Sequence, residues 1–242
     1  MHAPQNVRFL AVCAALFCGL QTAPASSLVD NLEAGREQTV VLYGTSLTQF
    51  GRWADTVKGH GGLADWLSGR YGGRAKVINS GMAGKASNSG VAQLDDKVLA
   101  YHPDTVILEF SVNDAYTGYP PAALDRGISL EQSKANLVTM IDRILAANPK
   151  TEIILQTMNP AWDANAAQQG SKRPGLAAYY QVYRDVAKER GLLLVDHDSS
   201  WRQMQTSRKA EFAAAVPDGV HPTAPASLAV TLPALQKALL EE

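Results

Sequence analysis

The chain has 242 residues, of which 46% are hydrophobic and 19% charged, and its formal net charge at pH 7 is −1. This composition excludes disordered, collagen-like and coiled-coil proteins, and the length fits one domain with a sizeable core. Because the sequence contains no run of Lys or Arg, no nucleic-acid partner is expected.

The first 25 residues have the pattern of a secretory signal peptide. Arg8 precedes an apolar run at 9–20, and Ala23 and Ala25 are the small residues that a signal peptidase requires. We therefore predict cleavage after Ala25, a secreted or periplasmic protein, and a single domain over residues 26–242. The apolar run is shorter than the roughly 20 residues that span a bilayer, so no stable membrane insertion is expected after cleavage. An uncleaved N-terminal anchor is the alternative.

Both cysteines, Cys13 and Cys18, lie inside this segment. Cleavage would leave a chain without cysteine, which excludes a disulfide scaffold, a thiol nucleophile and a metal site with cysteine ligands. No cofactor is expected, because the sequence lacks both a Gly-Lys-Ser/Thr phosphate loop and the Gly-x-Gly-x-x-Gly pattern of dinucleotide binding.

Beyond residue 25, five short apolar runs alternate with longer helical patterns. The runs lie at 39–43 (TVVLY), 76–79 (KVIN), 105–110 (TVILEF), 152–156 (EIILQ) and 192–196 (LLLVD). Mostly continuous runs of this kind are typical of parallel strands that are buried on both faces.

Three segments repeat apolar residues with the period of a helix. The first begins at a capping pattern formed by Ser129 and Gln132, and the second ends at Gly191. The third, at 228–239, contains Pro233, which is expected to kink it. Strands that alternate with helices predict a three-layer α/β/α domain with right-handed crossovers.

Polar motifs follow the first three strands, at the edge where parallel α/β sheets bind ligands. Gly44 permits a tight turn, and Ser46 lies at the start of the next helix, where backbone N–H groups can stabilise an anion. Gly81 and Gly84 would let a ligand approach the backbone, and the carboxamide of Asn113 can donate to an oxyanion. Taken singly, the serine and glycine motifs are more typical of an N-cap serine and a glycine turn, and the asparagine can equally be a turn residue that satisfies its own backbone.

Near the C-terminus, Asp218 precedes His221 by three residues. A carboxylate at this spacing can orient an imidazole as a general base, which a serine hydroxyl needs in order to act as a nucleophile. An isolated motif of this kind is otherwise typical of a solvated loop.

In this order and spacing, the four motifs closely resemble those of the SGNH (GDSL-type) hydrolase family over residues 44–222. The resemblance implies a flavodoxin-like α/β/α fold with about five parallel strands. It also implies hydrolysis of carboxylic esters without a cofactor or a metal.

The resemblance assigns a role to each motif. Ser46, Asp218 and His221 would form the catalytic triad. The backbone N–H groups of Ser46 and Gly84 and the side chain of Asn113 would form the oxyanion hole. Gly81 competes only weakly with Gly84 for this role.

Two residues near Ser46 differ from common serine-hydrolase motifs. Thr45 stands where the family usually has Asp, and although Gly-Thr-Ser versions exist, it cannot supply a carboxylate. Thr48 occupies the second glycine position of a Gly-x-Ser-x-Gly elbow, which argues against the α/β-hydrolase fold.

Glu109 is a carboxylate near the end of a predicted buried strand, so it must find hydrogen-bond partners. We expect it to brace the Asn113 loop or else to face the solvent.

The motifs predict acyl transfer to water, but they specify neither the acyl group nor the alcohol. Aromatic residues expected in loops, Tyr116, Tyr119, Trp162 and Trp201, favour stacking on sugar rings and hence a short-acyl or O-acetyl carbohydrate ester. The alternatives are a lysophospholipase or thioesterase, if a long apolar groove separates the loops after the third and fourth strands, an acyltransferase, and a non-catalytic glycan-binding module. Nothing in the sequence indicates the oligomeric state.

The stretch 159–175 is rich in Pro, Gly, Gln and Asn and is predicted to be a long loop. Its charges at Lys172 and Arg173 are expected to be solvated, with contact to an acidic sugar as the alternative. The run Asp196-His197-Asp198 is not expected to bind a metal, because adjacent residues of an extended segment point to opposite sides.

Overall fold

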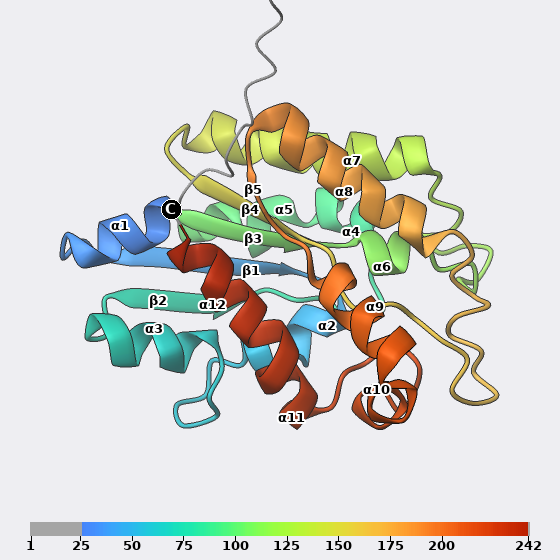
Figure 1. The fold of residues 1–242 in the computed structure, drawn as a ribbon. Coiled ribbons are helices and arrows are strands. Elements are labelled where there is room, and N and C mark those ends of the chain that lie inside the picture. The colour runs from blue at the N-terminus through green and yellow to red at the C-terminus, as the bar shows by residue number, and fades with distance from the viewer. Residues whose placement is uncertain (1–25, 242) are drawn as a thin grey trace, which may run out of the picture.

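The computed structural model describes residues 26–241, so the signal peptide predicted at 1–25 lies outside the described residues. At its centre is a five-stranded parallel sheet with the order β2-β1-β3-β4-β5 (Figure 1). The strands are β1 (Gln38–Gly44), β2 (Ala75–Asn79), β3 (Thr105–Glu109), β4 (Glu152–Gln156) and β5 (Leu193–Val195). Each strand agrees with its predicted run to within one residue at either end.

The strands are continuously apolar because both faces of the sheet are covered. In β1, Val40 and Leu42 pack into the core on one face, whereas Val41 and Tyr43 pack into the core on the other. All four side chains are fully buried. Successive side chains of a strand point to opposite faces, so a strand between two helical layers needs an apolar residue at every position.

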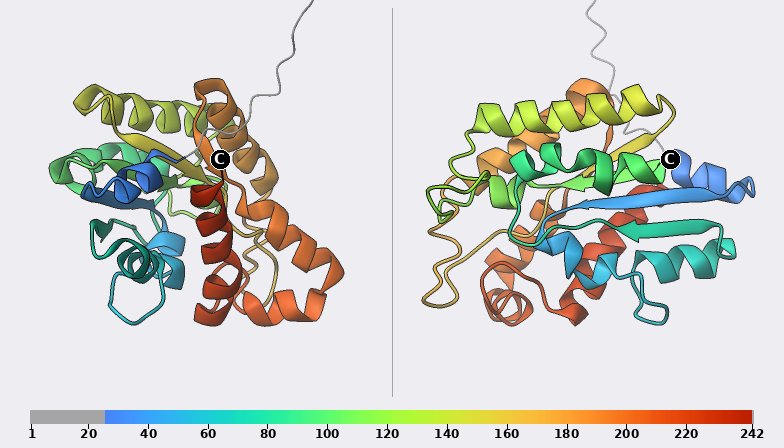
Figure 2. Two further views of the ribbon diagram at one scale, coloured as in Figure 1. Left: turned by 60° about the vertical axis from the view of Figure 1, so that its left-hand side comes forward. Right: turned by 180° about the vertical axis from the view of Figure 1, so that it is seen from behind.

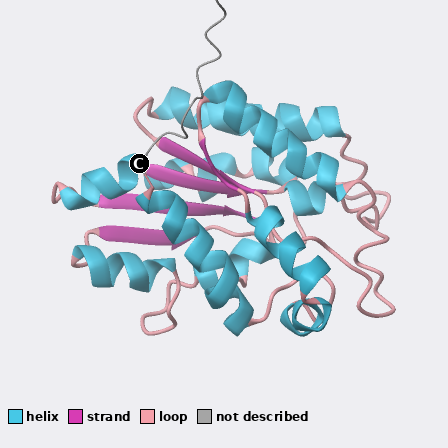
Figure 3. Ribbon diagram, in the orientation of Figure 1, coloured by secondary structure: helices cyan, strands magenta, loops and turns pink. Residues whose placement is uncertain are grey.

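Helices form a layer on each side of the sheet (Figures 2 and 3). One layer comprises α1 (Ser27–Glu33), α3 (Leu63–Tyr71) and α12 (Leu232–Leu240), and the other comprises α4 (Ser87–Ala92), α5 (Leu94–Lys97), α7 (Leu130–Ala147) and α8 (Leu176–Arg190). The other helical segments are α2 (Ser46–Gln49), η1 (Arg52–Ala54), η2 (Leu99–Tyr101), α6 (Ser111–Asp114), α9 (His197–Ser207), α10 (Lys209–Ala215), α11 (Ala224–Ala226) and η3 (Ser227–Thr231). The predicted fold class, a flavodoxin-like α/β/α architecture, is confirmed.

The ends of two predicted helices are where the sequence places them. At the start of α7, the Ser129 hydroxyl accepts a hydrogen bond from the Gln132 N–H at 3.2 Å. The helix α8 ends at Gly191, whose φ of +63° suits a residue without a Cβ.

The C-terminal helical pattern departs from the prediction of a simple kink. A π-helical turn, η3, lies between α11 and α12, and Pro233 falls in the first turn of α12. Proline has no N–H to donate to the preceding turn and crowds the carbonyl there, so the helix widens locally before it continues.

The carboxyl ends of the strands place three predicted motifs side by side. The strand β1 lies between β2 and β3, with Leu42 opposite Asn79 and Gly44 opposite Glu109. The segments that follow these strands therefore meet at one edge of the sheet, at the position where parallel α/β sheets bind ligands. Among the helices of residues 26–241, none combines the length and the apolar character that crossing a membrane requires.

Candidate active site

The nucleophile candidate sits at the turn between β1 and α2. Thr45 caps α2, because its hydroxyl accepts a hydrogen bond from the Leu47 N–H at 3.2 Å. Ser46 is the first residue of this helix. A Cβ at Gly44 would collide with the Glu109 side chain, so the turn can pass this close to β3 only with glycine at that position.

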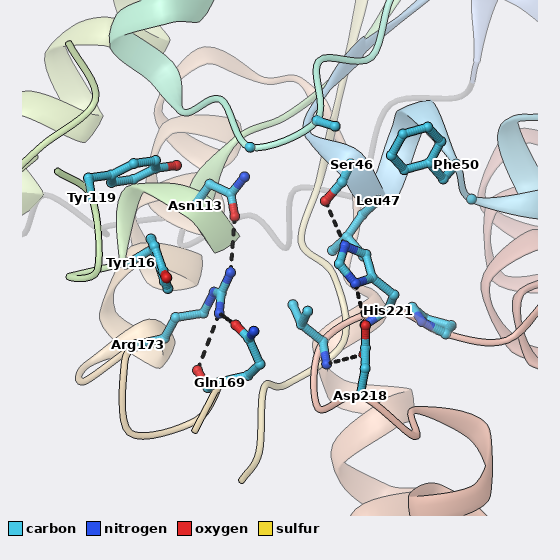
Figure 4. A pocket seen from close by; sticks show the side chains of 15 residues that line it. Ser46, Leu47, Phe50, Asn113, Tyr116, Tyr119, Gln169, Arg173, Asp218 and His221 are labelled. Atoms are coloured by element: carbon cyan, nitrogen blue, oxygen red, sulfur yellow. Dashed lines mark hydrogen bonds and ion pairs between the residues drawn. The ribbon is translucent and has the colours of Figure 1, made fainter. Parts of the chain in front are cut away.

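Ser46, His221 and Asp218 form one continuous chain of hydrogen bonds (Figure 4). The Ser46 Oγ lies 2.8 Å from His221 Nε2, and His221 Nδ1 lies 2.6 Å from Asp218 Oδ2. The second carboxylate oxygen of Asp218 accepts the N–H groups of Val220 at 2.9 Å and His221 at 2.7 Å. The structure thus brings together three residues that are up to 175 positions apart in the chain.

The hydrogen bonds around Asp218 favour its ionised form. Partial burial acts to raise the pKa of this carboxyl, but the backbone N–H groups of His221 and Val220 and the His221 ring outweigh it and lower the pKa below its ordinary value. An ionised Asp218 accepts a hydrogen bond from His221 Nδ1–H and so leaves the Nε2 lone pair facing the serine.

Gly84 and Gly81 have different surroundings. Gly84 lines the pocket with a φ of +68°, and a Cβ there would meet no atom within 4 Å. Gly81 is packed against the backbone of Gln49, and its N–H already donates to Asn79 Oδ1 at 3.0 Å. Within residues 26–241, the backbone N–H groups of Ser46 and Gly84 are paired with no acceptor, which leaves both able to donate to an anion.

Asn113, in α6, is 5% exposed and also lines the pocket. Its Nδ2 donates to the Lys85 carbonyl at 2.9 Å, and its Oδ1 accepts from Arg173 Nη2 at 3.2 Å. The carboxamide therefore has a defined orientation between the segment after β2 and the loop after β4.

Glu109 has a different role from the one predicted. It is fully buried and braces the turn around the serine, because it accepts hydrogen bonds from the Thr45 N–H at 2.7 Å, the Thr45 hydroxyl at 2.9 Å and the Thr48 hydroxyl at 2.7 Å. Burial raises the pKa of Glu109 to about 7, although these hydrogen bonds act to lower it. The strand β3 thus supplies the carboxylate that Thr45 cannot.

A pocket of about 520 Å³ opens beside Ser46 and His221. Its wall includes the aromatic side chains of Phe50, Tyr116 and Tyr119. Phe50 is 69% exposed at the rim, and the rings of Tyr116 and Tyr119 contact edge to face with centroids 5.1 Å apart. Sequence reasoning missed Phe50, whose only signal was its place one helical turn after Ser46.

Arg173 and Gln169 also line the pocket (Figure 4). The prediction that Arg173 is a solvated charge is wrong, because the residue is 8% exposed. Its side chain turns inward from the long loop, which occupies the region predicted at 159–175, and meets acceptors on α6 and on Gln169.

Other candidates from the sequence lie outside the pocket. Trp201 is in α9 rather than in a loop and is fully buried against Phe212, so it cannot stack on a sugar. Trp162 also packs on Phe212, and its ring N–H donates to the Val216 carbonyl at 2.8 Å.

The run from Asp196 to Asp198 belongs to a network of hydrogen bonds and ion pairs. Asp196 and Asp198 both accept from Arg184, at 2.8 and 3.0 Å, and the buried His197 ring lies 2.8 Å from Gln156 Oε1. Within residues 26–241, no group of three His, Cys, Asp or Glu side chains is placed to hold a metal ion.

Comparison with solved structures shows the same fold in several hydrolases. An acetyl-xylooligosaccharide esterase variant from Geobacillus stearothermophilus has a TM-score of 0.69 and 22% identity, covering 86% of this chain and 96% of its own. A putative GDSL-like lipase from Parabacteroides merdae has a TM-score of 0.69 and 20% identity, covering 84% and 96%. An α/β-hydrolase enzyme from the metagenome of Lake Arreo has a TM-score of 0.66 and 24% identity, covering 86% and 98%.

Structures of the Geobacillus enzyme, an acetylxylan esterase, include catalytic mutants in which a serine, an aspartate or a histidine is replaced by alanine. No curated protein sequence matches this chain significantly. The model of the GDSL-like lipase/acylhydrolase family matches residues 42–227, which contain all four motifs. The chain therefore belongs to the GDSL-like lipase/acylhydrolase (SGNH hydrolase) family and is a carboxylic ester hydrolase.

Proposed function

We propose that this protein is a serine esterase that removes short acyl groups, such as acetate, from hydroxyl groups of carbohydrates. The hydrogen-bonded chain from Ser46 through His221 to Asp218, which opens into the pocket, carries this proposal. The aspartate and histidine of the acetylxylan esterase mutants are likewise three positions apart, which supports the same roles for Asp218 and His221.

In the proposed mechanism, His221 Nε2 takes the Ser46 proton as Oγ attacks the ester carbonyl. The resulting oxyanion accepts hydrogen bonds from the backbone of Ser46 and Gly84 and from the Asn113 side chain. His221 then gives its proton to the leaving alkoxide, which departs as an alcohol and leaves an acyl-serine. Water, deprotonated by His221, attacks the acyl-serine, and the acid is released as Ser46 regains its proton.

The loops around the pocket support a short acyl group rather than a lipid chain. A lipid would need a long apolar groove between the loops that follow β3 and β4. Instead, the Thr117 N–H donates to the Lys172 carbonyl at 2.9 Å, and the Arg173 guanidinium lies over the Tyr116 ring at 4.7 Å. These contacts join the two loops and place a cation between them.

The aromatic wall of the pocket supports a carbohydrate alcohol. Exposed aromatic rings offer an apolar face with polar surroundings, which suits the C–H face of a sugar ring. Phe50 at the rim presents such a face beside the serine, and Tyr116 and Tyr119 present rings on the opposite wall (Figure 4). The sequence at 1–25 further supports action on glycans outside the cytoplasm.

The first experiment is a series of initial rates on p-nitrophenyl esters from acetate to dodecanoate, for the wild type and for Ser46→Ala. Fast cleavage of acetate that disappears in the variant is expected, followed by acetate release from acetylated xylo-oligosaccharides. A long-chain optimum would instead identify a lipid acylhydrolase. If no ester is cleaved and a serine-directed organophosphate does not label Ser46, the protein is a glycan-binding module on an esterase fold.

A further inference from the structure

Arg173 is a cation almost completely enclosed at the pocket wall. It is 8% exposed, and its Nε donates to the Val112 carbonyl at 2.9 Å. Its Nη1 donates to the side chain of Gln169 at 2.5 Å and to the Gln169 carbonyl at 3.3 Å. Its Nη2 donates to Asn113 Oδ1 at 3.2 Å, so two of the four hydrogen bonds of this side chain go to residues of α6.

This arrangement differs from that of an ordinary structural arginine. Among the ion pairs of residues 26–241, Arg184 contacts Asp196 and Asp198, whereas Arg173 contacts no carboxylate. Burial lowers the pKa of Arg173, and the neighbouring tyrosines and Asp218 only partly oppose this effect. Enclosing a cation without a counter-ion costs free energy, so its retention here needs a reason other than stability.

The hydrogen bonds of Arg173 determine which way the Asn113 carboxamide points. A guanidinium can only donate, so Arg173 requires the carboxamide oxygen, and the Lys85 carbonyl can only accept, so it requires the carboxamide nitrogen. The two partners exclude the flipped orientation. One Asn113 N–H bonds to Lys85, and within residues 26–241 the second has no acceptor; the carboxamide nitrogen lies on the Ser46 side of the pocket (Figure 4).

We infer that Arg173 is a positioning residue for the oxyanion hole. It holds the Asn113 amide with an N–H directed at the developing oxyanion, and its charge polarises the amide so that this N–H becomes a stronger donor. This inference rests on the proposed function and adds a residue from the long loop to the site.

A different role for Arg173 would be to bind an acidic group of the substrate. Four of its five N–H groups already have acceptors in Val112, Gln169 and Asn113, and the Tyr116 ring covers one face of the guanidinium. Among the residues that the structure describes, this leaves one N–H of Arg173 without an acceptor for a substrate carboxylate. The contacts favour action through Asn113.

The test is a double-mutant cycle with p-nitrophenyl acetate, a neutral substrate. Wild type, Arg173→Lys, Arg173→Gln, Asn113→Ala and the Arg173→Gln/Asn113→Ala double variant are compared in kcat, KM and melting temperature. Arg184→Lys is the matched control, because Arg184 is a partly buried arginine that pairs with carboxylates outside the pocket. It is expected to lower the melting temperature without changing kcat.

We expect Arg173→Gln to lower kcat by about 10²-fold, approaching the loss of a whole oxyanion donor, with KM changed less than about twofold. Glutamine removes the charge and offers Asn113 both an acceptor and a donor, so only the Lys85 carbonyl still disfavours the flipped amide. Arg173→Lys, which keeps the charge and can only donate, is expected to recover about tenfold of this loss. In the Asn113→Ala background, Arg173→Gln is expected to change kcat by less than about threefold.

Three outcomes would overturn the inference while the proposed function stands. These are an unchanged kcat in both Arg173 variants, a change confined to KM, and a loss that multiplies fully with that of Asn113→Ala. An inactive wild type that an organophosphate does not label would instead overturn the proposed function, and the positioning role with it. Arg173→Lys keeps the test decisive if Arg173→Gln does not fold.

Discussion

At the scale of single residues, the proposed chemistry depends on which nitrogen of His221 carries the proton. The short contact between Asp218 Oδ2 and His221 Nδ1 places a proton on Nδ1, so Nε2 is the nitrogen that accepts from Ser46. In the proposed mechanism, Ser46 and His221 act as a unit, and neither is useful without the other.

Ser46→Ala and His221→Ala are each expected to lower kcat by about 10⁴-fold or more. The double variant is expected to be no slower than either single variant by more than about threefold, because the first substitution already removes the shared step. Asp218→Ala is expected to cost less. Steady-state rates on p-nitrophenyl acetate check these values, and a His221→Ala variant with most of its activity would contradict the triad.

The two glycines after β2 give a contrast between activity and stability. Gly81→Ala drives a Cβ into the Gln49 backbone, so a clear fall in melting temperature is expected. Gly84→Ala meets no neighbour, but its φ of +68° costs an L-residue about 1 kcal/mol and moves the N–H proposed to bind the oxyanion.

We expect Gly81→Ala to lower the melting temperature more than Gly84→Ala does. For each degree by which the melting temperature falls, we expect Gly84→Ala to lower kcat more. Thermal melts and initial rates on the two purified variants make the comparison. If Gly84→Ala keeps the wild-type kcat, its backbone does not contribute to the oxyanion hole.

At the scale of secondary-structure elements, Glu109 joins β3 to the turn after β1. The strand register sets Gly44 opposite Glu109, so the carboxylate meets the N–H and hydroxyl of Thr45 at the place where α2 begins. Because this acid is buried, its contribution to the free energy of unfolding depends on pH.

The direction of this pH dependence follows from the pKa of Glu109 in the unfolded chain and in the folded chain. Burial raises the pKa of Glu109 from 4.5 to about 7, so between these values the folded chain holds a proton that the unfolded chain has lost. The contribution of Glu109 to the free energy of unfolding is therefore greatest below pH 4.5 and falls as the pH rises to about 7. Glu109→Gln removes this dependence.

We expect the melting temperature of Glu109→Gln, relative to wild type, to rise between about pH 5 and about pH 8. Thermal melts at several pH values measure it. Glu189→Gln, which alters an exposed ion pair with Lys134, is the control and is expected to show no such trend. A difference that is constant with pH would mean that Glu109 does not titrate in this range.

At the scale of the whole molecule, the long loop after β4 connects the two halves of the site. On one side, Arg173 holds α6 and Asn113. On the other side, the side-chain Nδ2 of the fully buried Asn159 donates to the Val220 carbonyl at 2.9 Å. The backbone N–H of Trp162 donates to the Gly219 carbonyl at 2.9 Å. The loop thereby supports the segment that carries Asp218 and His221.

Asn159→Ala is expected to lower both the melting temperature and kcat, the latter by about tenfold. It leaves the buried Val220 carbonyl without its donor and frees the segment that carries His221 to shift. Asn165→Ala, in an exposed part of the same loop, is the matched control and should change neither. A kcat that stays at the wild-type value in Asn159→Ala, measured on p-nitrophenyl acetate, would show that the loop does not support the triad segment.

The sequence alone determined the fold class and the identity of the triad and oxyanion candidates. Buried parallel strands must be apolar at successive positions, so their runs are visible without coordinates, and all five runs predicted their strands to within one residue. Spaced polar motifs after these runs are equally visible, because the sheet edge places them together whatever the details of packing.

Only the tertiary structure decided the environment of the buried charges. No local sequence pattern indicates the partners of Glu109 and Arg173. The partners of Glu109 lie 61 and 64 positions away in the chain. The α6 residues that Arg173 contacts lie 60 and 61 positions away. Their burial comes from strand register and loop docking. Trp201 and Trp162 illustrate the same limit, because an aromatic residue has the same sequence signal whether it packs or binds. Contacts between distant segments determine which of the two occurs.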